Sequence, residues 1–237
     1  MESRRTGLFQ KRHFAAEIIV TCVRWYLRFS LSLRDIEELM AERGLCVDHT
    51  TMWRWTQTYA PEVQRRLHGQ LKPKGSTWHI DETFVKIAGQ WMYLFRAVDS
   101  SGQTVDFYLS ETPDREAAKC FLKKARASPD NRPPHVFARD GLRSYPAAIR
   151  ELQNEGQLRR SCRHRTRRYA NNRIESDHRH IKWRLRAMQG PRTMVTATAL
   201  IAGIEAVQMI RKGQVLGIRK TNLHGQAWLF GALLGVK

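Results

Sequence analysis

Three acidic residues, far apart along the chain, stand in settings that suit a shared metal site. Asp81 falls in the middle of Thr77–Ile87, whose period of two with β-branched and aromatic residues predicts a strand. Asp140 ends a short apolar run, and Glu175 lies near the start of a helical pattern. A carboxylate inside a strand is costly to bury unless it is paired or binds a cation, so Asp81 is either a satisfied core residue or a metal ligand.

Three carboxylates that converge would offer hard oxygen donors, which suit Mg²⁺ or Mn²⁺ and not zinc. Two such ions, about 3.5–4 Å apart, can activate an attacking oxygen and stabilise a leaving 3′ oxygen at phosphorus. Lys182 lies two helical turns after Glu175 on the same face and could hold a phosphate. His79 and His178 could support the ligands, with an ordinary structural role as the equal alternative.

The charge of the chain points to an anionic partner. Its 237 residues carry a formal net charge of +19, and 42% are hydrophobic, which is enough for a core. Between Arg159 and Arg192 there are twelve Lys and Arg against two acids, Glu175 and Asp177. A solvated basic helix is the usual interpretation of such a run, but carboxylates inside it favour a cation site beside a track of phosphates. The stripe that carries Glu175 continues with Arg179, Lys182 and Arg186.

Other carboxylates compete for the role of ligand. Glu82 follows Asp81 and should point to the other face of the strand. Asp99 and Asp106 fall at hairpin positions, where we expect surface residues. Asp177 lies about 200° round the helix from Glu175, which disfavours it as a ligand.

The central segment alternates strand and helix patterns. Strands are expected at 77–87, 91–99, 104–110, 135–140 and 157–162. Helices are expected from Thr112–Pro113, where an N-cap precedes a proline, at 144–154, and around Glu175. The buried stripe of the last helix would consist of Ile174, His178, Ile181, Leu185 and Met188.

Three helices are expected before residue 70. They fall at about 13–29, after the capping residue Ser32, and after the capping residue Asp48, with Pro61 beyond the end of the third. This layout resembles a helix-turn-helix, although a three-helix bundle that binds protein is the alternative. If the third helix enters the major groove, its early outward residues contact DNA; they are His49, Thr50, Thr51 and Arg54.

Neither secretion nor a membrane span is indicated. The run Met194–Ile210 is interrupted by Gly203, Glu205 and Gln208, so we expect no membrane segment. The apolar tail 226–236 is a dimer contact or a packed tail. The cysteines are scattered, fit a reducing cytoplasm, and should be buried or inert; they are Cys22, Cys46, Cys120 and Cys162.

Taken together, five stretches resemble the DDE transposases of bacterial insertion sequences, most closely the insertion-sequence-six group. They are Trp78–Lys86, Tyr93–Ser100, Asp140 with Tyr145, Tyr169–His178, and Lys182. Asp140 and Glu175 are separated by 34 residues, and Lys182 follows Glu175 by seven, as in that group. The resemblance runs from about Phe9 to Gln214.

The resemblance implies an α/β fold: N-terminal helices followed by an RNase H-like mixed five-stranded sheet flanked by helices, as in retroviral integrases. It implies a helix-turn-helix domain at 1–70, a catalytic domain at 77–212 and a tail at 213–237. Asp81, Asp140 and Glu175 would bind two Mg²⁺ or Mn²⁺ ions, with Lys182 as a further catalytic residue. Phosphate contacts would come from Arg179, Lys182 and Arg186.

The implied activity is recognition of terminal inverted repeats and 3′-end strand transfer into target DNA, commonly giving cointegrates, by a homodimer or higher oligomer in the bacterial cytoplasm at the nucleoid. Two other functions fit parts of the sequence. A non-catalytic DNA-binding regulator derived from such an enzyme would keep the helix-turn-helix without metal chemistry. A structure-selective nuclease would use the metals without joining 3′ ends.

Overall fold

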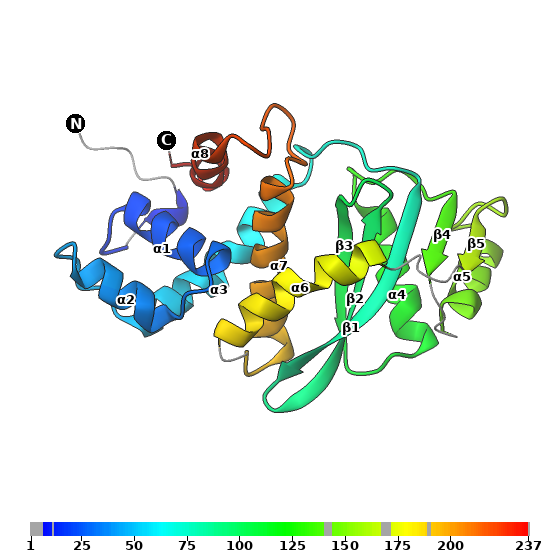
Figure 1. Cartoon of the computed structure of the whole chain (residues 1–237), viewed down its shortest axis with the longest axis horizontal. Helices are drawn as coiled ribbons and strands as arrows, with labels where there is room; N and C mark the ends of the chain where they lie inside the picture. Colours follow the sequence, from blue (N-terminus) through cyan, green and yellow to red (C-terminus); the bar gives the residue numbers. More distant parts are fainter. Residues whose placement is uncertain (1–6, 11, 140–143, 167–171, 189–190, 237) are drawn as a thin grey trace. The chain divides into compact units, whose positions relative to one another are not determined.

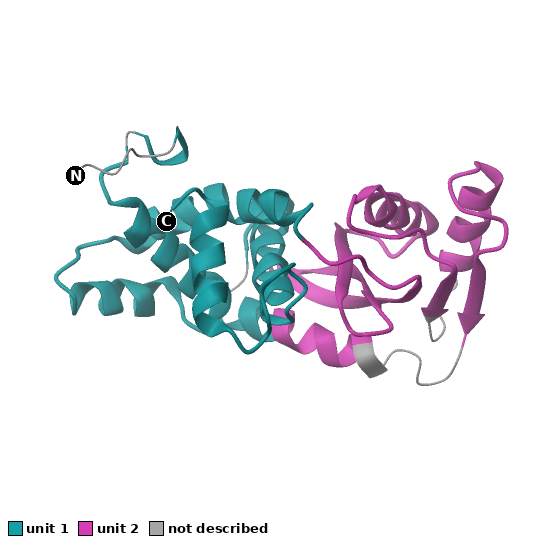
Figure 2. Ribbon diagram, turned by 90° about the horizontal axis from the view of Figure 1, so that it is seen from above, with its two compact units in different colours: residues 1–70, 183–237 teal, residues 71–182 magenta. Residues whose placement is uncertain are grey.

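The fold is that of a computed structural model, which describes residues 7–10, 12–139, 144–166, 172–188 and 191–236 (Figure 1). The chain forms two compact units (Figure 2): residues 1–70 with 183–237 make unit 1, and residues 71–182 make unit 2. The domain boundaries given from sequence, with a catalytic domain at 77–212, stay a prediction. In the structure, residues 183–212 group by packing with the N-terminal helices and not with the sheet.

Unit 2 is built on a five-stranded sheet in the order β3-β2-β1-β4-β5. The strands are β1 Thr77–Ile87, β2 Gln90–Asp99, β3 Thr104–Ser110, β4 Val136–Arg139 and β5 Arg163–Thr166. The first three are antiparallel, whereas β4 is parallel to both β1 and β5. This arrangement confirms the predicted fold class, a mixed five-stranded sheet flanked by helices.

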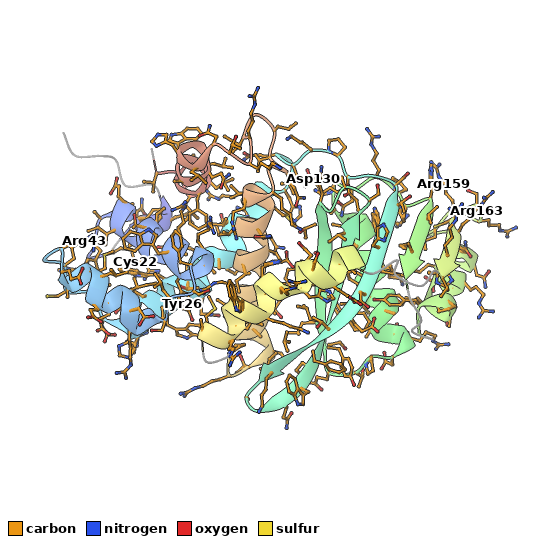
Figure 3. All side chains as sticks on the ribbon, in the orientation of Figure 1. Cys22, Tyr26, Arg43, Asp130, Arg159 and Arg163 are labelled. Carbon is orange, nitrogen blue, oxygen red and sulfur yellow. The ribbon has the colours of Figure 1, made fainter. Side chains whose placement is uncertain are left out.

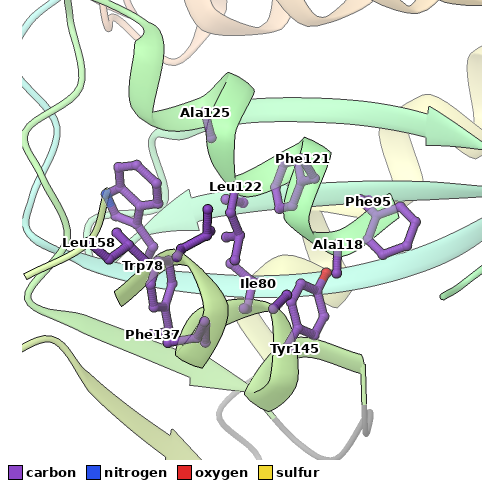
Figure 4. Close-up of a cluster of buried hydrophobic side chains, with 14 of the residues drawn as sticks. Trp78, Ile80, Phe95, Ala118, Phe121, Leu122, Ala125, Phe137, Tyr145 and Leu158 are labelled. Atoms are coloured by element: carbon purple, nitrogen blue, oxygen red, sulfur yellow. The ribbon is translucent and has the colours of Figure 1, made fainter. Parts of the chain in front are cut away.

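One face of this sheet is covered by α4 (Arg115–Ala127) and α5 (Ser144–Asn154). In Figure 4, Trp78 and Ile80 of β1 pack among side chains of both helices and of β4. Both residues are fully buried. Because side chains alternate along a strand, His79 and Asp81 project from the opposite face. The core therefore fixes which side of β1 is free to carry chemistry.

Two element boundaries in unit 2 differ from the sequence prediction. The predicted N-cap Thr112 is wrong: α4 is capped by Asp114, whose Oδ1 accepts a bond of 2.8 Å from the Ala117 amide. The hydroxyl of Thr112 instead donates to Asp114 at 2.7 Å. A carboxylate can accept from the backbone and from a side chain at once, and it also favours the positive end of the helix dipole.

The fifth strand was placed too early by the sequence prediction. Residues 157–162 form the turn after α5, where the amides of Gln157 and Leu158 donate to the carbonyl of Leu152 at 2.8 and 2.9 Å. The strand is the basic segment β5, which pairs only with β4 and so is an edge strand. Figure 3 labels Arg163, its first residue, and Arg159 of the preceding turn. An edge strand can expose charged side chains, so hydrophobic alternation does not mark it.

Asp99 and Asp106 are not the surface residues expected from sequence, because only 2% and 4% of their surfaces are exposed. Oδ1 of Asp99 accepts from the amides of Ser101 and Gln103, at 2.9 Å each, and closes the β2–β3 hairpin. Asp106 accepts a charged bond of 2.8 Å from Lys124 of α4. Burial is tolerable here because each carboxylate has donors.

Unit 1 contains the three helices predicted before residue 70: α1 Ala16–Arg28, α2 Leu33–Ala41 and α3 His49–Leu67. Ser32 and Asp35 form the predicted capping box, and Asp48 caps α3. The expected stop at Pro61 is wrong, since α3 continues to Leu67. A proline costs one helical hydrogen bond. Buried Val63 and Leu67 in the following turns outweigh that cost.

Two further helices, α7 Met194–Arg211 and α8 Leu223–Leu233, complete unit 1. A Cβ added to Gly203 would lie 2.6 Å from the Cβ of Ala60, so α7 approaches α3 closely. By length and composition alone α7 could cross a membrane, but 61% of it is buried inside the protein, as in a core helix. The C-terminal segment is a packed tail, with Phe230 and Leu233 of α8 buried.

The cysteines are free thiols. Cys22 and Cys162 are buried, and burial raises the pKa of each thiol to about 11. A thiol with such a pKa holds its proton at neutral pH and reacts poorly. These two residues therefore match the prediction of inert thiols, whereas Cys46 is exposed.

Candidate active site

Asp81 stands directly opposite Arg96 in the antiparallel register of β1 and β2. Residues opposed in this way project from the same face of a sheet. Arg96 is fully buried, while the Asp81 side chain keeps 17% of its exposure. The face turned away from the core of α4 and α5 therefore carries a carboxylate that solvent can still reach.

The helix α6 (Asn172–Ala187) meets this face through two consecutive residues. Oδ2 of Asp177 accepts a bond of 2.7 Å from Nη2 of Arg96. Nδ1 of His178 lies 3.8 Å from Oδ2 of Asp81. Asp177, which the sequence disfavoured as a metal ligand, is thus the partner of a buried guanidinium. This pair fixes the rotation of α6 against the sheet.

His178 is a neutral neighbour of Asp81. Burial, with a smaller contribution from the charges of Arg96 and Lys182, lowers the pKa of its imidazole to about 3. At neutral pH the approach of 3.8 Å is therefore no ion pair, and it is too long for a hydrogen bond. Its Nε2 is buried without a hydrogen-bond partner among the residues that the structure describes.

Glu175 begins the exposed stripe of α6. It lies three residues before His178, and helical residues at this spacing are surface neighbours. His178 therefore lies one turn from Glu175 along α6 and 3.8 Å from Asp81 of β1. Two of the three predicted ligands, Asp81 and Glu175, thus lie near the same buried side chain.

Asp140 itself lies outside the described residues. The strand before it is described: β4 ends at Arg139 and runs parallel to β1. In that ladder His79 pairs with Ala138, and Asp81 and Asp140 each follow these paired residues by two positions in the sequence.

The predicted phosphate-binding residues of α6 are exposed. Arg179 and Lys182 belong to unit 2, and Arg186 belongs to unit 1. Because the charge of Lys182 lowers the pKa of His178, its ammonium lies within electrostatic range of the site. Trp183 is 74% exposed, so its ring is not used in packing.

The predicted DNA-reading residues of α3 fall into two groups. Thr50 and Arg54 are exposed one turn apart, and Thr51 is half-buried. His49 contacts Glu37 of α2 through Nδ1 at 3.0 Å, so it joins the two helices. The amide and hydroxyl of Thr50 both donate to the capping carboxylate of Asp48. Arg54 is therefore the predicted contact with the most freedom to reach DNA.

Sequence reasoning missed the role of Arg96. A lone arginine inside an apolar strand, directly across from Asp81 once the hairpin register is known, is the signal that could have found it. The sequence disfavoured its partner Asp177 as a metal ligand but could not identify the contact with Arg96, because helix periodicity predicts no contacts between separate elements.

Comparison with known families decides the identity of the chain. Residues 75–214, more than half of the chain, match a family described as a DDE domain. Over 204 residues the chain is 37% identical to the transposase for insertion sequence-like element IS431mec of Staphylococcus aureus, which covers 86% of this chain and 88% of that protein. The chain belongs to the DDE transposases of insertion sequences. The transposase is therefore a DNA-binding polynucleotidyl transferase.

A second relative supports the same group. The transposase for insertion sequence element IS257 in transposon Tn4003 of Staphylococcus aureus shows the same 37% identity and coverage. Among solved structures, the transposase partly resembles the HTLV-2 integrase catalytic core domain in complex with magnesium, with a TM-score of 0.43 and 14% identity over 64% of this chain and 96% of that chain. The family assignment rests on the sequence relatives.

Proposed function

We propose that this transposase cleaves DNA at the ends of its insertion sequence and transfers the 3′ ends to target DNA, with Asp81, Asp140 and Glu175 holding divalent ions. The observation that carries the proposal is the position of His178, which contacts Asp81 and neighbours Glu175 on α6. An active site assembled from strand and helix in this way suits in-line displacement at phosphorus.

The donor set fits Mg²⁺ or Mn²⁺. Carboxylate oxygens are the ligands these hard cations prefer, and both Asp81 and Glu175 remain accessible to solvent. Two bound ions would supply an activated attacking oxygen and stabilise the leaving 3′ oxygen. The neutral imidazole of His178 adds no positive charge that would repel a cation.

The remaining residues of the site bind and orient the DNA strand. Arg179 and Lys182 present exposed cations one turn apart on α6, suited to neighbouring phosphates. The pair of Arg96 and Asp177 holds the helix in place without contacting substrate. Because Arg96 is buried, its charge is used for positioning and is not available to the phosphate track.

The N-terminal helices would recognise the terminal inverted repeats, with Arg54 and Thr50 on the exposed side of α3. An oligomer must hold two DNA ends together for their joint transfer, and a cointegrate is the expected product. The bacterial cytoplasm, at the nucleoid, is where the substrate lies.

A strand-transfer assay tests the proposal. Labelled duplexes carrying the element's ends are incubated with target DNA and Mg²⁺. We expect Asp81→Asn and Glu175→Gln to lower joining at least a thousandfold while binding of the ends is retained. The matched control is Glu116→Gln, an exposed carboxylate in the first turn of α4, which should join DNA like the wild type.

Full joining activity in the Asp81→Asn protein would refute the proposal. End binding by the wild type with neither cleavage nor joining would identify a regulator that has lost catalysis. Metal-dependent cleavage without joining would identify a nuclease.

A further inference from the structure

Unit 1 contains a pocket lined by three arginines, apart from the predicted helix-turn-helix contacts. Arg24 and Arg28 lie one turn apart on α1, and Arg211 ends α7. Gln226 and Phe230 of α8 line the same pocket, which holds about 210 Å³ of empty space, its open mouth included. Three separate helices thus bring their side chains to one place.

The positive charge in this pocket is not neutralised by a carboxylate. Within the described part of the chain, none of the three guanidinium groups has an acidic oxygen within 4 Å, and Arg211 donates instead to the neutral Gln208 at 3.2 Å. Other arginines of the protein are paired, as Arg65 is with Glu62 and Arg96 with Asp177. The three arginines therefore give the pocket a positive charge that suits an anion.

Their electrostatics show that the arginines repel one another. Burial lowers the pKa of Arg28, and the charges of Arg211 and Arg24 lower it further. Burial also lowers the pKa of Arg24 and of Arg211. Holding like charges together costs folding free energy, which a bound anion would offset.

The walls of the pocket indicate which part of an anionic ligand it accepts. Phe230 is fully buried, so its ring cannot stack on a base. The amide nitrogen of Gln226 is committed to the carbonyls of Lys220 at 2.8 Å and Arg219 at 3.4 Å. The groups that remain are the guanidinium groups of the arginines, whose paired N–H donors match the oxygens of a phosphate.

We propose that the pocket of Arg24, Arg28 and Arg211 binds a backbone phosphodiester of duplex DNA, as a contact that is independent of sequence. Arg211 lines the pocket and is exposed, so a projecting phosphate can reach its charge. The choice of DNA rests on membership of the transposase family and on the net charge of +19, and does not require the catalytic proposal to be correct.

The salt dependence of binding tests this inference on the full chain. Fluorescence anisotropy measures the affinity for an end-containing duplex and for an unrelated duplex, each between 50 and 200 mM NaCl. Loss of one phosphate contact lowers the slope of log affinity against log salt by about 0.9. We expect this change in Arg211→Gln and in Arg28→Gln, for both duplexes alike. The control Arg126→Gln, exposed in the last turn of α4, should keep the wild-type slope.

Melting curves keep the test independent of folding. Arg211→Gln changes an exposed side chain, and Arg28→Lys keeps the charge but removes the planar guanidinium group. DNA binding by these two variants can therefore be measured even where Arg28→Gln misfolds. Arg211→Gln should melt no lower than the wild type, because a repulsion between like charges is removed. Arg28→Lys should keep most of the slope and lose affinity.

Wild-type slopes and affinities in both Arg211→Gln and Arg28→Lys would overturn the inference. A loss confined to the end-containing duplex would do so too, because it would mean base readout. The same holds if inorganic phosphate stabilises the protein through these arginines while DNA binding is unchanged in the variants. If the wild type fails in strand transfer but the salt slopes of the variants change as expected, only the catalytic proposal is contradicted.

Discussion

At the scale of single residues, a buried guanidinium determines how the site is assembled. Arg96 has no exposed surface, and its bond to Asp177 is a charged contact between the sheet and α6. A guanidinium cannot lose its proton in a protein, so removing its carboxylate partner leaves an uncompensated buried charge. His178 and Glu175 lie on the same helix within two residues of Asp177, so this bond positions them as well.

We predict that Asp177→Asn lowers the free energy of unfolding by about 3 kcal/mol, because a buried charge loses its compensating partner. Joining activity should fall with it, since α6 is no longer fixed, whereas binding to an unrelated duplex should be little changed. Urea unfolding at neutral pH measures the first effect. The control Glu155→Gln removes an exposed partner of Lys119 and Lys123 and should cost much less. Equal losses in the two variants would contradict a structural role for the buried pair.

At the scale of elements, a close helix contact in unit 1 depends on one glycine. A Cβ on Gly203 would lie 2.6 Å from Ala60 on α3 and 2.8 Å from Leu27 on α1. Neither neighbour can move without shifting its helix or repacking a buried side chain. Glycine has a poor helix propensity, but at this position it is needed because only a residue without a Cβ permits the close approach.

Gly203→Ala should therefore lower the free energy of unfolding by about 1–3 kcal/mol, as overpacking does in tight cores. The matched control is Gly231→Ala in α8, where the added Cβ comes no closer than 3.4 Å to another atom. That variant should be neutral or more stable by about 0.5–1 kcal/mol, from helix propensity alone. Calorimetric melting of both proteins checks the sign, and a stabilised Gly203→Ala would disprove the close approach.

Elements were predictable from sequence where one pattern dominated. The alternation of residues in β1 predicted that strand correctly, and the capping box at Ser32 predicted the start of α2. Both elements are determined by interactions between residues that are close in the sequence. β5 could not be found in this way, since its backbone pairs with β4 while its basic side chains face solvent. Pro61 misled because buried residues in the next turns hold α3 together across it.

At the scale of the whole molecule, periodicity predicted the faces of α6 but not the contacts between elements. The stripe with His178 is buried and the stripe with Glu175 is exposed, as the spacing indicated. The pairing of Asp177 with Arg96, which lie 81 residues apart, follows only from the folded sheet. The arginine pocket of unit 1 likewise joins α1, α7 and α8, which no local pattern links.

Manganese binding tests most directly whether distant carboxylates share a metal. Electron paramagnetic resonance of Mn²⁺ titrated into the full-length protein gives an affinity for the wild type, Asp81→Asn, Glu175→Gln and the double variant. If one site needs both oxygens, each single variant should bind at least ten times more weakly, as removal of a donor from a metal site does. The double variant should then lose little more than either single variant. Wild-type affinity in both single variants would contradict the shared site and, with it, the proposed chemistry.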